Sequence, residues 1–131
     1  MQQKPIPIAI AMVICDMVIE DVRTRKKSLV GLFNNISTSK VPVTHPRLNV
    51  YIALTEGRGD YDAELRCINL DDNEIVGGMK GPLKFVSPQQ IVEFNFEICN
   101  FVLPRYGNYR FDFLCSDRLV ISRKFHLTPT K

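Results

Sequence analysis

Apolar and polar residues alternate with a period of two along most of this 131-residue chain. Successive side chains of a β-strand point to opposite faces, so this period is typical of strands with one face buried and the other in water. Residues 92–98 show it most clearly, because Val, Phe, Phe and Ile alternate there with Glu, Asn and Glu. Helical spacing is not sustained anywhere, and Gly and Pro residues separate the alternating runs. The sequence therefore predicts an all-β fold.

Eight strands can be assigned, with short polar turns between several of them. We place them at residues 8–20, 28–36, 47–55, 60–69, 74–80, 90–99, 108–116 and 118–127. The Asp-Asp-Asn run at 71–73 and the Ser-Asp pair at 116–117 predict tight hairpins. Seven to eight short strands at regular intervals indicate an antiparallel β-sandwich or barrel. We expect a single β-sandwich domain over residues 1–131.

The composition excludes several classes of protein. The chain is 45% hydrophobic and 24% charged, which does not fit disorder, collagen-like repeats or membrane spans. A net charge of +3 is too small to indicate a nucleic-acid partner. The apolar run at 6–15 resembles a secretion signal, but its small residues lie inside the run instead of after it. We therefore expect a buried strand there, a cytoplasmic protein and no membrane contact.

No residue pattern points to catalysis or to a metal. The four cysteines show no CxxC spacing, and in a reducing compartment we expect free thiols at Cys15, Cys67, Cys99 and Cys115. His45, placed in a loop before Pro46, and His126 on an outward strand face are isolated and expected to be exposed. No serine lies in a nucleophile elbow, and no glycine-rich phosphate loop precedes a helix. We expect no enzymatic activity, cofactor or metal.

The first predicted strand is apolar on both faces, with Asp16 as the only charged residue between positions 8 and 19. A long strand that bends and switches sheets buries opposite faces in its two halves, and this is the simpler interpretation. The alternative is that a second chain covers one face. Residues 8–19, or an exposed strand edge, are therefore the predicted surface for self-association.

Two charged residues fall on apolar strand faces. Asp16 shares a face with Ile14 and Val18, and Arg123 shares one with Ile121 and Phe125. Because an isolated charge is costly to bury, we predict that Asp16 and Arg123 form a buried pair or are each bonded by backbone groups. The alternative is a bulge that turns Arg123 out to solvent.

The densest charged run lies in the first hairpin loop and consists of Arg23, Arg25, Lys26 and Lys27. It is a candidate contact for an anion or an acidic partner. Runs of this kind are more often solvated loop tips, and no aromatic stacking residues accompany this one.

A Pro/Gly bend leads into a Tyr-x-Phe strand at residues 104–113. It resembles the turn into the penultimate strand of immunoglobulin-like sandwiches, where a tyrosine hydrogen-bonds back to the backbone; Tyr109 is the candidate for this tyrosine corner. With residues 13–16, 28–33 and 45–48, the chain resembles an uncharacterised bacterial family of single-domain sandwich proteins of about this length. The resemblance implies an immunoglobulin-like fold and no catalytic residue, and the basic first hairpin departs from it.

The sequence thus predicts a non-enzymatic protein-interaction or structural module of the bacterial cytoplasm, with self-association as one of its modes. The alternative is a sandwich that binds a carbohydrate or an anion. The chain has no Trp, which argues against a sugar platform, although Tyr51 and Tyr106 offer aromatic faces.

Overall fold

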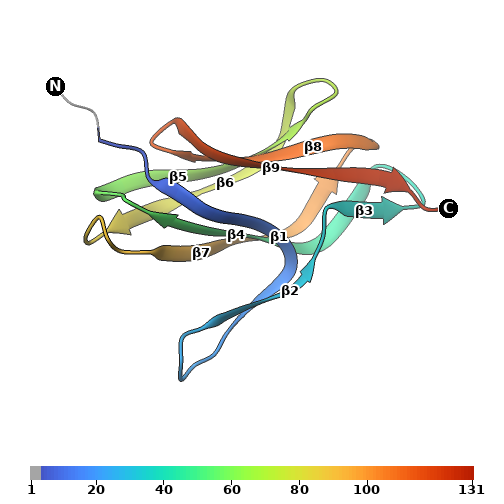
Figure 1. The fold of residues 1–131 in the computed structure, drawn as a ribbon. Coiled ribbons are helices and arrows are strands. Elements are labelled where there is room, and N and C mark those ends of the chain that lie inside the picture. Colours follow the sequence, from blue (N-terminus) through green and yellow to red (C-terminus); the bar gives the residue numbers. More distant parts are fainter. Residues whose placement is uncertain (1–3) are drawn as a thin grey trace.

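A computed structural model describes residues 4–131, so residues 1–3 of the expected domain lie outside the described part. Within that part the chain forms nine strands and no helix, arranged in two layers (Figure 1). The strands are β1 (Ile8–Glu20), β2 (Lys27–Leu32), β3 (Asn35–Thr38), β4 (Val43–Thr55), β5 (Gly59–Asn69), β6 (Glu74–Phe85), β7 (Val92–Leu103), β8 (Gly107–Cys115) and β9 (Arg118–Pro129). The all-β prediction is confirmed, although the strands number nine instead of seven or eight.

The strands form two sheets. The order β2–β1–β4–β7 makes a four-stranded antiparallel sheet, and the order β3–β9–β8–β5–β6 makes a five-stranded sheet. In the five-stranded sheet β3 runs parallel to β9, whereas the other pairs are antiparallel. The expectation of a wholly antiparallel fold is therefore wrong for β3. The parallel direction arises because the chain reaches β3 by crossing over from the other sheet and not through a hairpin with β9.

The predicted strand 28–36 is in fact two strands in different sheets. β2 ends first, and Phe33 and Asn34 carry the chain across to β3. Gly31 has a positive φ of 72°, a conformation that glycine adopts without strain. A Cβ atom at Gly31 would also collide with the carboxylate of Asp16 on the paired strand. Apolar residues continue through the crossing, so the period-two pattern did not reveal it.

The core lies between the two sheets and is rich in aromatic rings. Tyr109 and Phe111 of β8 stack on Phe125 of β9, with ring centroids 5.3 and 5.2 Å apart. From the four-stranded sheet, Val50 and Ile52 of β4 join the same core and are fully buried. Each such side chain contributes about 1.5–3 kcal/mol by leaving water, so this alternating pattern dominates the stability of the fold.

β1 is apolar on both faces because a bulge changes which of its residues point into the core. The bulge lies between Ala9 and Ala11, where the register with β4 shifts. Ala9 packs against the core before the bulge, whereas Met12 and Ile14 are buried after it. One extra residue changes which alternate positions face inward, and Ile10 is left 53% exposed. β1 remains in one sheet, so the interpretation that it switches sheets is wrong.

Gly78 and Gly81 offer a matched test of how closely β6 packs against the backbone of β5. A Cβ on Gly78 would lie 2.7 Å from the carbonyl oxygen of Leu65 on β5, whereas a Cβ on Gly81 would meet nothing within 4 Å. We expect Gly78→Ala to lower the free energy of unfolding by about 1–3 kcal/mol, because the β5 backbone must shift. Gly81→Ala should be neutral or slightly stabilising. Urea denaturation of both variants measures this, and equal midpoints would contradict the close approach.

Candidate functional site

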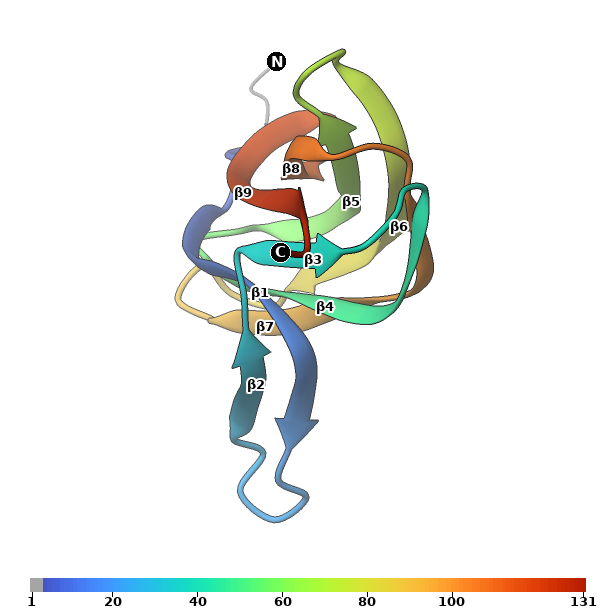
Figure 2. The ribbon, with the colours of Figure 1, turned by 90° about the vertical axis from the view of Figure 1, so that its right-hand side faces the viewer.

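β1 and β2 continue beyond the core as a projecting two-stranded hairpin (Figure 2). The ladder between β1 and β4 ends at Cys15 and Asn49, and from Met17 to Glu20 the only partner of β1 is β2. A two-stranded hairpin is marginally stable in water unless something covers one of its faces. The hairpin is therefore the element of the fold whose surfaces are least used by the protein's own core.

One face of this hairpin is apolar and exposed. The register places Met17 opposite Val30 and Cys15 opposite Leu32, so these four side chains share a face with Ile19. Ile19, Val30 and Leu32 are 49%, 43% and 64% exposed. We call Met17, Ile19, Val30 and Leu32 the hairpin patch.

The four basic residues predicted as a contact site, Arg23, Arg25, Lys26 and Lys27, lie at or next to the tip of the hairpin. Glu20 pairs with two of them, with N–O distances of 3.3 Å to Arg25 and 3.2 Å to Lys27. Hydrogen bonds from Lys27 and Arg25 lower the pKa of Glu20. Among residues 4–131, Arg23 and Lys26 form no ion pair. The tip is therefore a weaker site for a polyanion than the run of four cations suggests.

A buried asparagine holds the point where the hairpin leaves the sheet. Asn49 is 2% exposed, and its side-chain amide donates to the backbone carbonyl of Asp16 at 3.0 Å. Asn95 of β7 donates in turn to the side-chain oxygen of Asn49 at 2.6 Å. Asp16 is the first residue of β1 beyond the β4 ladder. The Asn49 side chain thus supplies a hydrogen bond where the ladder stops.

The same outward side of β4 and β7 carries an acidic residue. We call the side of the four-stranded sheet turned away from the core its outer face; Tyr51 and Glu93 lie on it. The Tyr51 hydroxyl donates to the carboxylate of Glu93. Burial and this bond raise the pKa of Tyr51 to about 12. Within the described chain, Glu93 has no cationic partner.

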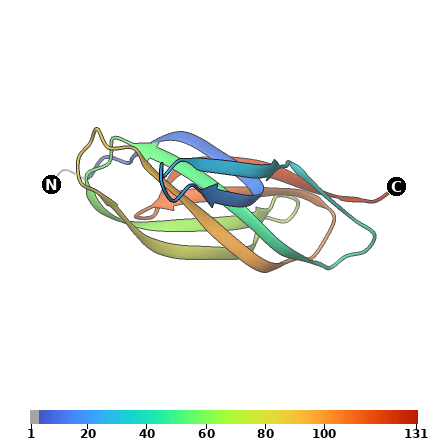
Figure 3. The ribbon, with the colours of Figure 1, turned by 90° about the horizontal axis from the view of Figure 1, so that it is seen from below.

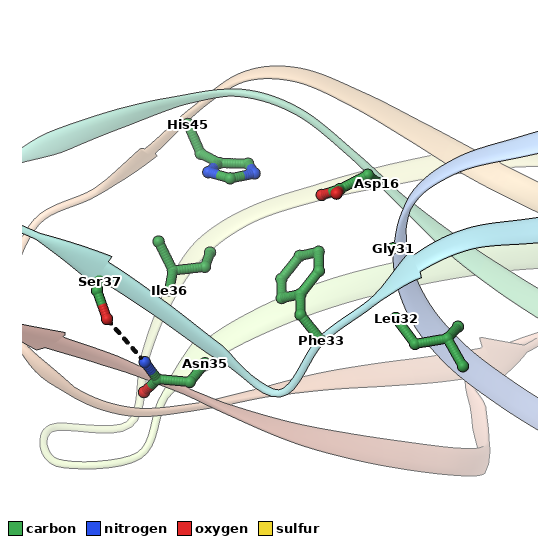
Figure 4. A pocket seen from close by; sticks show the side chains of 8 residues that line it. All are labelled: Asp16, Gly31, Leu32, Phe33, Asn35, Ile36, Ser37 and His45. Atoms are coloured by element: carbon green, nitrogen blue, oxygen red, sulfur yellow. Dashed lines mark hydrogen bonds between the residues drawn. The ribbon is translucent and has the colours of Figure 1, made fainter.

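A groove lies at the base of the hairpin, where the chain crosses from β2 to β3 (Figure 4). It has a volume of about 330 Å³ and is lined by Asp16, Gly31, Leu32, Phe33, Asn35, Ile36, Ser37 and His45. A second hollow of about 540 Å³ shares two of these residues and is lined by Asp16, His45, Pro46, Arg47, Glu97 and Cys99. Both open to solvent, and Asp16 and His45 lie between them.

His45 is half-buried and lies in β4, so the prediction of an exposed loop histidine is wrong. β4 extends through Pro46, which has no N–H to donate and no counterpart in the β7 ladder. The His45 ring lies 6.0 Å from that of Phe33, centroid to centroid. Burial lowers the pKa of His45, while the charge of Asp16 and a hydrogen bond with the Arg47 backbone raise it. Asp16 and His45 therefore interact across the groove.

Comparison with known proteins places the chain in a family. The profile of the family of unknown function DUF6941 matches residues 10–128. The chain belongs to DUF6941. The sequence resemblance to an uncharacterised family is thereby confirmed, and no curated protein matches the sequence. Among solved structures, the fold is similar to a beta-glucosidase from Kluyveromyces marxianus at 16% identity and a TM-score of 0.45, over 76% of this chain and 16% of that one. This likeness assigns neither fold nor function.

In this DUF6941 protein Asp16 and Arg123 do not form the predicted buried pair. Both side chains are exposed, and Arg123 donates to the side-chain oxygen of Asn34 at 3.0 Å. Asp16 is exposed because the hairpin carries it beyond the core. Arg123 is exposed because β3 begins opposite His126, which leaves the earlier part of β9 without a neighbour on that side.

Tyr109 lies where the bend enters β8, and its ring is fully buried. Its hydroxyl donates to the carbonyl of Arg105 and accepts from the Arg105 N–H at 3.2 Å. These bonds join the bend before β8 to the core, as expected of a tyrosine corner.

The four cysteines of the DUF6941 protein are free thiols, three of them buried and Cys99 exposed. Burial raises the pKa of Cys67 strongly and that of Cys115 to about 11, so both are protonated and weakly nucleophilic at neutral pH. In residues 4–131 no three His, Cys, Asp or Glu side chains converge as metal ligands would. The part of the chain that the structure describes also contains no helix long and apolar enough to cross a membrane.

The buried amide of Asn49 sets the rigidity of the hairpin base. We expect Asn49→Ala to lower the free energy of unfolding by about 1–3 kcal/mol, because it leaves the Asp16 carbonyl and the Asn95 amide unpaired. Hydrogen exchange of the hairpin amides should also accelerate more than that of β8. Uniform acceleration in both segments would show that Asn49 acts only on global stability.

The Asp16–His45 interaction can be measured by titration. Removing the carboxylate charge disfavours the imidazolium ion, so Asp16→Asn should lower the pKa of His45 further. Asp60→Asn, outside both hollows, is the matched control and should leave His45 unchanged. The His45 ring-proton shift followed by NMR measures both, and an unchanged or higher pKa in Asp16→Asn would contradict the contact.

Proposed function

We propose that this DUF6941 protein is a non-enzymatic protein-interaction module, an immunoglobulin-like sandwich of the bacterial cytoplasm that contacts its partner through the β1–β2 hairpin. The observation that carries the proposal is the hairpin patch, which lies on an element projecting from an otherwise closed core. Contiguous apolar surface on a soluble domain is typical of an interaction site.

The immunoglobulin-like description is supported by two features. Two sheets of β-strands enclose a single core, and the Tyr109 hydroxyl bonds back to Arg105 at the bend before β8. The cytoplasmic assignment is supported by the four unpaired thiols, since a reducing compartment maintains cysteines in this state.

The non-enzymatic assignment is supported by the arrangement of the groups around the second hollow. Cys99 is the exposed thiol there; its Sγ donates to a Glu97 oxygen at 3.7 Å, and no hydrogen bond joins it to His45. The thiol therefore lacks the imidazole base of a Cys–His pair.

A second candidate function is the binding of a small polar ligand in the groove. Phe33 offers a ring edge there, and Asn35 and Ser37 offer polar groups, 3.1 Å apart (Figure 4). The carbohydrate form of this alternative has less support, because Tyr51 is only 9% exposed and the Tyr106 hydroxyl bonds the Thr38 carbonyl. The anion form has less support because Glu20 pairs two tip cations.

Affinity capture from a lysate of the source organism tests the interaction proposal. We expect a protein that is captured by the wild type to be lost about tenfold or more with Leu32→Glu, because a charge would enter the apolar contact. Ile75→Glu is the matched control, since Ile75 is 62% exposed but lies on β6 in the other sheet. Equal capture by all three proteins would rule out the hairpin as the contact.

A further inference from the structure

We infer that the surface which covers the hairpin patch is a second copy of this chain: two copies clasp each other, each placing its hairpin against the hairpin and outer face of the other. This inference rests on the proposed function, because it takes the hairpin to be the contact element. It adds the identity of the partner and the residues that meet.

The first step is the direction of the hairpin. It leaves the four-stranded sheet on the outer face and leans back beneath β4 and β7 (Figures 1 and 3). Alternation along β1 puts the patch on the same face as Val13 and Cys15, which pair with Tyr51 and Asn49 on the outer face. When a strand bends toward its outer face, the side chains of that face line the inside of the bend. The hairpin patch and the outer face of the same sheet therefore line the two sides of the angle between the hairpin and the sheet.

The second step is that a two-fold axis makes this shape self-complementary. A rotation of 180° places the hairpin of one copy inside the angle of the other, so that the two patches meet and each tip points at the partner's outer face. An isologous contact of this kind closes at two copies and leaves no free patch. The patch is apolar on both sides of such a contact, which removes the exposed Ile19, Val30 and Leu32 from water in both chains.

The third step is charge. Packed sheets lie about 10 Å apart and a strand rises about 3.3 Å per residue, so the partner's tip meets the outer face about three residues back from Cys15. Three residues back is Met12, which faces the core, so on the outer face this position lies between the row of Val13, Tyr51 and Asn95 and the row of Ala11, Ala53 and Glu93. The carboxylate of Glu93 is held over β4 by the Tyr51 hydroxyl. The tip thus brings cations to the unpaired carboxylate of the outer face.

The tip cations suited to this contact are Arg23 and Lys26, because Glu20 already pairs with Arg25 and Lys27. A two-fold contact repeats every interaction twice. It is attractive in both copies when the basic side chains of each chain meet an acidic side chain of the other. A hairpin patch flanked by cations alone would repel a second copy.

The apolar part is tested by sedimentation velocity on the purified protein from micromolar to millimolar concentration. The wild type should reach twice the 15.0 kDa chain mass. Ile19→Glu and Leu32→Glu should each raise the dissociation constant about tenfold or more, whereas Ile75→Glu on β6 should not change it. Circular dichroism of each variant checks that it folds, which the exposure of these side chains favours.

The charged part of the contact is tested by exchanging the charges of the tip cations and of Glu93. At low salt, Arg23→Glu with Lys26→Glu should raise the dissociation constant about fivefold, and adding Glu93→Lys to the same chain should restore it. Asp60→Asn is the control for Glu93→Gln, since Asp60 is exposed and forms no ion pair within residues 4–131 but lies on β5 in the other sheet. Only Glu93→Gln should weaken the dimer.

A chain that stays monomeric up to millimolar concentration overturns the inference, as does a dimer that the patch variants do not weaken. A monomer that binds anionic phospholipid vesicles through its basic tip overturns it as well. A monomer that still captures another protein, and loses it with Leu32→Glu, overturns the inference but retains the proposed function. The lysate and pure-protein experiments thus separate the two failures.

Discussion

The hydrogen bond from the Asn49 side chain to the Asp16 carbonyl marks the place where the four-stranded sheet ends and the hairpin begins. Up to Cys15, β1 has β4 as its neighbour, and beyond it β1 has only β2. A backbone carbonyl at the end of a ladder needs a partner, and a buried amide supplies one without continuing the sheet. The projecting hairpin, the groove at its base and the exposed patch all depend on this ending.

Two different regions surround the hairpin at the point where the ladder between β1 and β4 ends. On one side, Asp16 and His45 line two hollows, where the charge of Asp16 acts against the effect of burial on His45. On the other side, an apolar patch faces an outer face that carries Glu93. The groove suits a small ligand, whereas the apolar patch suits a protein surface, and Leu32 belongs to both because it lies where the two regions meet.

Much of the fold followed from local patterns. The alternation in residues 47–55, 60–69 and 108–116 placed the core side chains correctly, and the turns at 71–73 and 116–117 occur with positive φ at Asn73, Ser116 and Asp117. The division of 28–36 between two sheets was not predictable, because apolar residues run through it. The basic tip could be located from its composition, but its pairing with Glu20 could not, since that depends on the register of β1 and β2.

The sequence by itself determined that the chain is all-β and which side chains of most strands face a core, because a period of two is a property of each strand alone. It also placed the four basic residues in one loop. Only the tertiary structure decided which strands are neighbours, where β1 loses its partner, and that Asp16 and Arg123 are exposed and form no ion pair with each other. Burial depends on what lies on the other side of a strand, and no pattern within that strand contains this information.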